Sequence, residues 1–251
     1  MADALAAIAL LALVCYGLTG GADYGGGVWD LLARGPRAEA HRRLVSDAIG
    51  PIWEANHVWL ILVIVILFTA FPIGFAVIAT ALHIPLTLML VGIVLRGSAF
   101  TFRSYDLGHG GLGHRFGTPF AIASLLTPIL LGVNLGALGS GGIVVEGGRV
   151  VSGFVGPWLR LFPFAVGILA LCLFAYLAAV YLAVEAAQRK EEPALGEDFR
   201  RRGLLAAAVA AVVAVAVFAL ARVAAPRLYA HLLTLWPLHG LTLGLSALAA
   251  L

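Results

Sequence analysis

Long apolar segments, separated by short polar ones, make up almost the whole chain. A helix that crosses the hydrocarbon core of a bilayer needs about 20 apolar residues. Seven segments are close to this length or exceed it, namely residues 3–20, 50–71, 73–95, 118–139, 160–186, 203–222 and 230–250. The pattern predicts an all-α fold, a polytopic bundle of about seven transmembrane helices that forms a single transmembrane domain over residues 1–251.

The connections between these segments are short. The second and third segments meet at "FPIG", where Pro72 acts as a helix breaker, so we expect a tight turn and an antiparallel hairpin. The first segment has the length of a signal-peptide core, but no basic residue precedes it and no small-x-small cleavage site follows, so we expect a helix. Three glycine-rich stretches, "GGADYGGG", "GHGGLGH" and "GALGSGG", are expected to be turns at the membrane faces.

Composition supports a membrane protein and excludes an ordinary soluble domain. The chain is 62% hydrophobic and 12% charged, and its mean hydropathy is +1.02. The net charge of +3 does not indicate nucleic-acid binding. Arginine is abundant here together with Ala, Gly and Leu, which is the composition bias that a GC-rich genome produces. Cys15 and Cys172 lie singly within apolar segments, which favours buried thiols over a disulfide framework.

Arginine placement predicts the orientation of the bundle. Cytoplasmic connections of membrane proteins carry an excess of Lys and Arg. Twelve of the sixteen basic residues fall on one predicted face, and they are Arg34, Arg37, Arg42, Arg43, Arg96, Arg103, Arg115, Arg189, Lys190, Arg200, Arg201 and Arg202. We therefore expect this face to be cytoplasmic and the N-terminus to lie outside.

Polar residues at the start of the second segment are the main candidates for chemistry. Glu54, Asn56 and His57 lie between Trp53 and Trp59. Residues three apart share a helix face, so the Glu54 carboxyl and the His57 imidazole point nearly the same way. A carboxyl group partly removed from water can load and release a proton near neutral pH. The alternative is that tryptophan and glutamate only anchor the helix end at the headgroup level.

Asp23 is a second candidate acid, and we expect it just past the first helix, on the same face as Glu54. The glycines on both sides allow the backbone to approach another element closely. It could take part in proton transfer or in an interface. The alternative is a loop aspartate that caps a short helix starting near Tyr24.

Arg96 and Arg103 flank "RGSAFTFR" at the end of the third segment. The two are seven residues apart, so they align on one face if the helix continues. Two such arginines can hold an anionic group, such as a carboxylate, a lipid phosphate or a haem propionate. The simpler interpretation of either residue is a snorkelling anchor.

These motifs together resemble subunit II of the cytochrome bd-type quinol oxidases. The segments that carry the resemblance are "GADYGGGVWDLL", "IGPIWEANHVWLI", "LRGSAFTFR" and "TPILLGVNLGALGSGG", in the family's order. Trp53, Asn56 and Trp59 support the most specific motif. The sequence departs from the family pattern at two positions, with Ala55 in place of Gly and His57 in place of Gln or Glu. The family usually has about eight helices, so the resemblance suggests a divergent and short member.

The resemblance implies a function for the complex as a whole. Such oxidases oxidise membrane quinol and reduce dioxygen to water, with haem b and haem d held by the partner, subunit I. In such a complex this chain would be a subunit that does not ligate haem and has no metal site of its own. It would provide a cytoplasmic proton path through Glu54, with His57 carrying or tuning the proton. Further partners implied are membrane lipid, a bound quinone and a small accessory subunit, in the bacterial inner membrane. The alternatives are a proton-coupled transporter and a purely scaffolding subunit.

Overall fold

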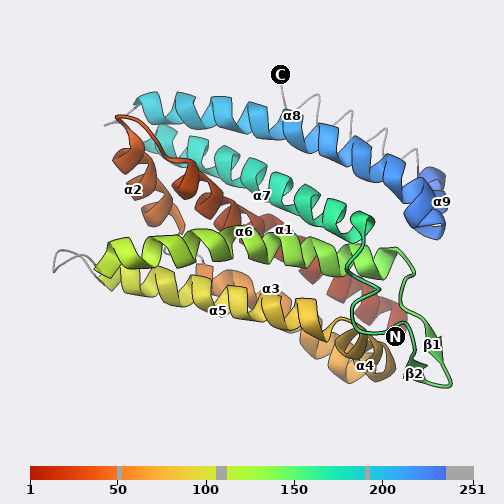
Figure 1. Ribbon diagram of the computed structural model, residues 1–251. Coiled ribbons are helices and arrows are strands. Elements are labelled where there is room, and N and C mark those ends of the chain that lie inside the picture. The colour runs from red at the N-terminus through yellow and green to blue at the C-terminus, as the bar shows by residue number, and fades with distance from the viewer. Residues whose placement is uncertain (50–52, 106–111, 190–192, 236–251) are drawn as a thin grey trace.

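The computed structural model describes residues 1–49, 53–105, 112–189 and 193–235, apart from the side chains of residues 49, 53–54, 103–105, 112–118 and 193 (Figure 1). Almost all of this part is helical. The elements are α1 (Ala2–Leu32), α2 (Ala38–Ile49), α3 (Trp53–Ala70), α4 (Pro72–Ala81), α5 (His83–Tyr105), α6 (Leu112–Gly139), β1 (Val145–Glu146), β2 (Arg149–Val150), α7 (Leu161–Gln188), α8 (Pro193–Ala224) and α9 (Pro226–Thr234). The two strands form a small antiparallel hairpin in which Val145 pairs with Val150.

Five helices within the described residues are long and apolar enough to cross a membrane, and they are α1, α5, α6, α7 and α8. The pair α3 and α4 forms a sixth candidate span that is bent by 117°. The predicted all-α, polytopic fold is therefore confirmed. The seventh predicted span, residues 230–250, falls mostly outside the described residues; its first part belongs to the short helix α9.

Helix α1 does not end near residue 20, as the sequence suggested, but continues to Leu32 through "GGADYGGG". The expected turn is wrong because these glycines serve close helix packing. A Cβ atom on Gly25 would lie 1.9 Å from the carbonyl oxygen of Phe174 in α7, and one on Gly27 would lie 2.2 Å from the Ser124 hydroxyl in α6. Small residues of this kind let transmembrane helices approach closely. Asp23 consequently lies inside a helix and does not cap one.

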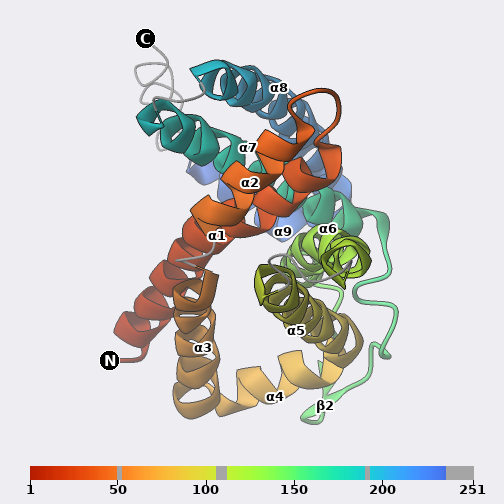
Figure 2. The same cartoon turned by 90° about the vertical axis from the view of Figure 1, so that its left-hand side faces the viewer.

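The expected hairpin at Pro72 is also wrong. Phe71 leaves helical geometry, with φ −129° and ψ 53°, and Pro72 then starts α4 as its first residue. Proline suits this position because it has no N–H group to leave unpaired. Helix α4 runs between the ends of α3 and α5, which do not lie against each other (Figure 2). Helix α3 packs on α1, whereas α5 packs on α6.

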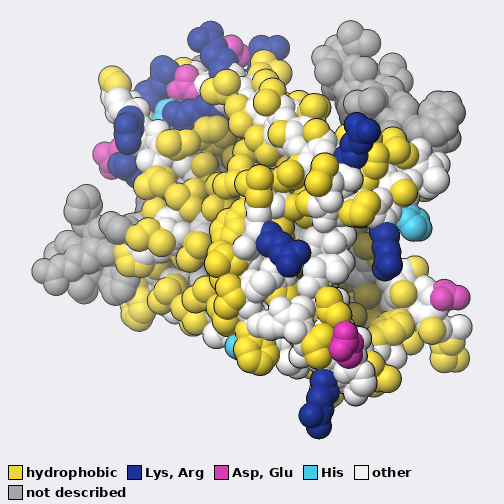
Figure 3. Space-filling view, turned by 45° about the vertical axis from the view of Figure 1, so that its right-hand side comes forward, with side chains coloured by type: hydrophobic (Ala, Val, Ile, Leu, Met, Phe, Trp, Pro, Cys, Tyr) yellow, Lys and Arg dark blue, Asp and Glu magenta, His cyan; other side chains and the backbone are white. Residues whose placement is uncertain are grey.

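The helix directions bring the basic connections to one end of the bundle. The α1–α2 connection, α2 and the start of α8 lie at the end opposite the N-terminus, α4 and α9 (Figure 1). Lys and Arg side chains gather there, while apolar side chains cover the middle of the molecule (Figure 3). We call this region the basic end. Arg96 is an exception to the predicted grouping, because it lies inside α5 and is only 2% exposed.

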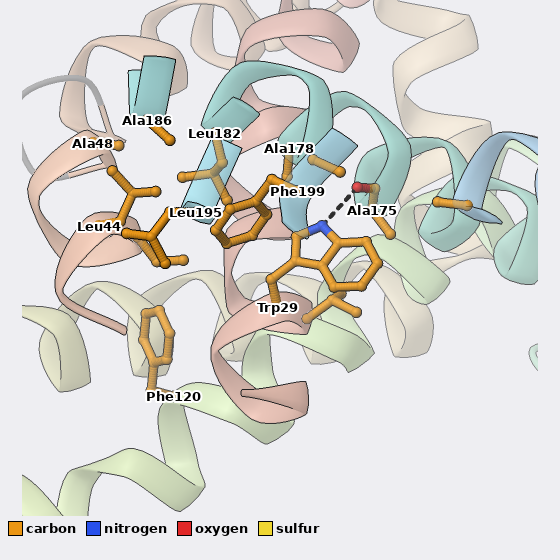
Figure 4. Close-up of a cluster of buried hydrophobic side chains, with 14 of the residues drawn as sticks. Trp29, Leu44, Ala48, Phe120, Ala175, Ala178, Leu182, Ala186, Leu195 and Phe199 are labelled. Carbon is orange, nitrogen blue, oxygen red and sulfur yellow. Dashed lines mark hydrogen bonds between the residues drawn. The ribbon is translucent and has the colours of Figure 1, made fainter. Parts of the chain in front are cut away.

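Helix α7 lies at the centre and contacts α1, α6 and α8. Its alanines allow close packing, and Trp29 of α1 donates a hydrogen bond from Nε1 to the carbonyl oxygen of Ala175, 2.8 Å away (Figure 4). Phe199 of α8 is fully buried in the same apolar cluster. This cluster fixes α1, α2, α7 and α8 together near the basic end.

Candidate functional site

A buried ion pair joins α1 to α5. The Arg96 guanidinium donates from Nη2 to Asp23 Oδ1 at 2.7 Å and from Nη1 to Asp23 Oδ2 at 3.0 Å. Nη2 also donates to the backbone carbonyl oxygen of Asp23 at 2.8 Å, and Nε donates to the Ser124 hydroxyl of α6 at 3.2 Å. Both partners are almost completely buried. The planar fork of arginine matches a carboxylate in this bidentate geometry.

Aromatic rings complete the surroundings of Arg96. The guanidinium carbon lies 4.8 Å from the centroid of the Tyr24 ring and 5.1 Å from that of Phe120. The Tyr24 hydroxyl is also 3.4 Å from the hydroxyl of Tyr16, eight residues or just over two helical turns earlier on α1. We call Tyr16, Asp23, Tyr24, Arg96 and Ser124 the polar cluster.

The ion pair explains how two charges can lie inside a membrane span. Charged side chains within the bilayer are costly unless they pair or face water. Removing one member of a buried pair typically costs about 3–5 kcal/mol, because the other charge is left uncompensated. Asp23 and Arg96 therefore neutralise each other and hold their helices together, and a snorkelling role for Arg96 is ruled out by its burial.

The predicted motif of α3 lies next to the polar cluster. Asn56 is buried and donates from Nδ2 to the carbonyl oxygen of Thr19 in α1, at 3.3 Å. The ring of His57 stands edge-on to that of Tyr16, with 6.3 Å between centroids. The structure thus brings Asn56 and His57 beside the turn of α1 that precedes Asp23.

The remaining predicted residues are placed as follows. Glu54 belongs to the first turn of α3, where the helix macrodipole favours a negative charge. The side chains of Glu54, Trp53 and Arg103 lie outside the described residues. Trp59 is described and is 38% exposed.

Three members of the polar cluster were not predicted from the sequence, namely Tyr16, Tyr24 and Ser124. A weak signal existed for the tyrosines, because two phenol groups eight residues apart in an otherwise apolar span need partners. Ser124 gave no such signal, since a serine in a span commonly bonds to its own helix.

Metal-ligating side chains do not gather in the described part of the chain, where no group of three or more His, Cys, Asp and Glu residues could hold an ion. The histidines whose side chains are described lie on four different helices. His83 Nδ1 bonds to the Thr80 carbonyl and its ring packs on Phe154, and His231 bonds to the carbonyl of Arg227. These positions do not fit a pair of axial haem ligands.

Fold and site together define a polytopic helical membrane protein whose spans are locked by an internal aspartate–arginine pair. The family described as cytochrome bd terminal oxidase subunit II matches over residues 1–251, and the chain belongs to this family. It is accordingly a multi-pass protein of the bacterial inner membrane.

Individual relatives agree with this assignment. The chain is 35% identical over 95 residues to cytochrome bd ubiquinol oxidase subunit 2 of Bacillus subtilis (strain 168), covering 38% of this chain and 28% of the relative. It is 28% identical over 126 residues to cytochrome bd-I ubiquinol oxidase subunit 2 of Escherichia coli (strain K12), covering 50% of this chain and 32% of the relative. The matched segments are thus about a third of these relatives' length or less.

A solved structure has the same fold. The structure of bd oxidase from Geobacillus thermodenitrificans superposes with a TM-score of 0.74 and covers 93% of this chain and 70% of that one. The sequence identity is 21%, so this likeness concerns the fold alone.

Proposed function

We propose that this chain is the subunit of a bd-type oxidase that supports quinol oxidation and dioxygen reduction to water by supplying protons from the cytoplasm. In this proposal the haems b and d belong to a partner, subunit I, and the basic end faces the cytoplasm. Reduction of dioxygen consumes protons as well as electrons, so turnover requires a path that delivers protons at the same rate.

The observation that carries the proposal is the set of side-chain contacts between α3 and α1. Asn56 bonds to Thr19, and His57 contacts Tyr16, close to the buried pair of Asp23 and Arg96. Ionisable groups within a span are costly and mark functional paths. Here the Asp23 carboxylate and the His57 imidazole come from separate helices yet lie in one region.

Glu54 and Asp23 have different roles in this proposal. Protonating Asp23 would leave the buried Arg96 without its counter-charge, so Asp23 is better suited to fix the helices than to cycle a proton. Glu54, one helical turn before His57, is the group that loads the proton, and His57 carries it or tunes Glu54. Asp23 would join the path only if Arg96 found another anion during turnover.

The donor groups of the chain support haem ligation by the partner. His41 bonds to Asp198, and the His57 ring stands edge-on to that of Tyr16. The protein ligands for haem are assigned to subunit I because the family to which the chain belongs implies this, and no step of the reaction is derived through haem in this chain. A bound quinone and a small accessory subunit are further partners of the proposed complex.

Co-purification tests the function. The tagged full chain is purified from its native membrane, and a reduced-minus-oxidised spectrum and quinol-driven oxygen uptake are recorded. We expect a haem-bearing partner, haem signals and oxygen uptake. A preparation with no haem-bearing partner would contradict the oxidase function, and proton-coupled solute uptake by such a preparation would favour the transporter.

A further inference from the structure

Arginine side chains surround a cavity at the basic end, away from the polar cluster. The cavity has a volume of about 480 Å³ and lies between the α1–α2 connection, α2 and the first turns of α8. Its lining residues are Arg34, Pro36, Arg37, His41, Asp198, Arg201 and Arg202. We call it the arginine pocket. Four arginines face one aspartate in this lining, so the pocket is strongly positive.

The single carboxylate in the lining, that of Asp198, already has hydrogen-bond partners on both oxygens. Asp198 Oδ1 accepts from Arg37 Nη2 at 2.8 Å, and Oδ2 lies 3.1 Å from His41 Nε2. Arg201 is paired with Glu197, 2.9 Å away. Among the described residues, neither Arg34 nor Arg202 has a carboxylate within ion-pair distance. The pocket therefore keeps positive charge that the carboxylates of the described residues do not pair with.

Two buried polar atoms of the pocket residues also lack partners. His41 is 3% exposed, and its Nδ1 has no hydrogen-bond partner. The same is true of Nη1 of the half-buried Arg202. Leaving a buried donor of a charged group unpaired costs free energy. Arg202 Nη1 is such a donor, whereas His41 Nδ1 is an acceptor when the neutral ring donates from Nε2 to Asp198. Among the described atoms of the pocket residues, the Arg202 donor therefore favours an anionic ligand.

Two of the pocket side chains also pack against buried aromatic rings. The Arg202 guanidinium lies 5.2 Å from the ring centroid of Phe199 and 5.7 Å from that of Trp29. The His41 ring stands edge-on to Phe199 at 5.3 Å. Trp29 and Phe199 belong to the buried cluster of Figure 4, so Arg202 and His41 pack against the apolar core of the bundle.

We propose that the arginine pocket binds a phosphate group. Arginine is the preferred partner of phosphate, because its donors match the phosphate oxygens pairwise. The pocket lies just beyond Leu32, where the apolar helix α1 ends, and beside the charged first turns of α8, which precede the apolar run that starts after Arg202. We therefore place it at the headgroup level. Basic pockets of this kind between transmembrane helices hold anionic lipid headgroups. A small soluble phosphate compound would offer the same chemistry, and the inference does not depend on the proposed oxidase function.

Three variants of the full chain, purified with its partners and delipidated in neutral detergent, test the site. Arg34→Gln removes an exposed pocket arginine that has no packing role. Arg202→Gln removes the arginine with the unpartnered atom. Arg200→Gln is the matched control, because Arg200 neighbours the pocket arginines on α8 but does not line the pocket.

Binding is measured by native mass spectrometry and thermal unfolding in two arms. The first compares phosphatidylglycerol with phosphatidylcholine, and the second compares sodium phosphate with sodium chloride at equal ionic strength. Loss of a charge-assisted hydrogen bond should weaken binding by about tenfold or more in Arg34→Gln and Arg202→Gln, with no such change in Arg200→Gln.

The two arms distinguish the source of the phosphate. Stabilisation by phosphatidylglycerol alone identifies a lipid headgroup, whereas stabilisation by inorganic phosphate as well identifies a soluble phosphate site. The proposal is overturned if neither ligand binds the unmodified chain more tightly than its comparison partner. It is equally overturned if Arg200→Gln loses as much binding as Arg34→Gln, because the effect would then reflect overall charge.

Discussion

Asp23 and Arg96 are 73 residues apart in the sequence, yet their side chains form a bidentate ion pair with N–O distances of 2.7 and 3.0 Å in the interior of the bundle. The pair connects α1 directly to α5, and Ser124 ties α6 to the same guanidinium. Both charges depend on each other, since neither has access to water. The ion pair therefore holds together helices that are distant in the sequence.

Arg96→Met should destabilise the protein more than removal of any exposed arginine. It leaves the Asp23 carboxylate buried and uncompensated, which typically costs about 3–5 kcal/mol. We expect a lower yield of the assembled complex and a lower thermal midpoint. Arg200→Gln is the control, because Arg200 is exposed and its partner Glu197 also bonds to Arg201.

The double variant Asp23→Asn with Arg96→Met should be more stable than the sum of the two single changes predicts. It removes both charges at once, so no buried charge remains unpaired. Thermal unfolding of the two single variants and the double variant gives the coupling free energy. If the changes in unfolding free energy of the two single variants add up to that of the double variant, the two charges do not stabilise each other.

Gly25→Ala should disrupt the packing of α1 on α7. The added Cβ atom would lie 1.9 Å from the Phe174 carbonyl oxygen, which belongs to a helix backbone and cannot move alone. Gly17→Ala is the matched control on the same helix, since no atom lies within 4 Å of its added Cβ. Alanine favours helix over glycine by about 1 kcal/mol, so Gly17→Ala should be neutral or stabilising. Equal thermal midpoints of the two variants would contradict this packing.

Hydrophobic patterning predicted the helical class of the fold, but not where helices continue. Glycines usually indicate a turn, and only the contacts of Gly25 and Gly27 with neighbouring helices show why α1 continues through them. Pro72 was correctly expected to interrupt a helix. Its result, a short α4 bent by 117° from α3 and no hairpin, depends on tertiary contacts that the sequence alone does not reveal.

The candidate residues were visible in the sequence, whereas their partners were not. Asp23 and Arg96 each stood out as charges near or within apolar segments. Their pairing depends on how α1 and α5 are placed around α6, which no local pattern encodes. The same holds for His41 and Asp198, which are 157 residues apart in the chain.

Acid should destabilise the basic end through His41. Burial lowers the pKa of His41 below its ordinary value, the nearby Arg202 lowers the pKa further, and the hydrogen bond to Asp198 opposes both. The unfolded chain therefore binds a proton at a pH where the folded chain does not. The free energy of unfolding should fall as the pH falls below about 6.5, the ordinary pKa of histidine.

His41→Gln retains a donor for Asp198 but cannot titrate, so its thermal midpoint should depend less on pH in this range than that of the unmodified chain. His231→Gln is the control, because His231 is exposed on α9. Buffers without phosphate are needed, since a bound phosphate would favour the protonated imidazole. Identical pH profiles for His41→Gln and the unmodified chain would remove His41 as the cause.

Glu54→Gln should strongly reduce quinol-driven oxygen uptake while leaving the haem spectrum of the complex near normal. Glutamine keeps the size and hydrogen bonding of the side chain but cannot exchange a proton, so delivery of protons would limit turnover. Oxygen uptake and spectra of the purified complex in proteoliposomes measure both properties. Glu39→Gln is the matched control, because it makes the same change at an exposed position of α2, where Glu39 pairs only with Arg43 among the described residues.

Two further variants separate the role of Glu54 from that of His57. Glu54→Asp should keep part of the activity, since it shortens the side chain but retains the acid. His57→Ala should have a smaller effect than Glu54→Gln if the imidazole, which lies against Tyr16, only tunes the carboxyl group, and an equal effect if it carries the proton. If Glu54→Gln turns over like the unmodified chain across a range of pH, Glu54 only anchors the start of α3. Protons for dioxygen reduction must then enter elsewhere, and the partner subunit would be the place to search.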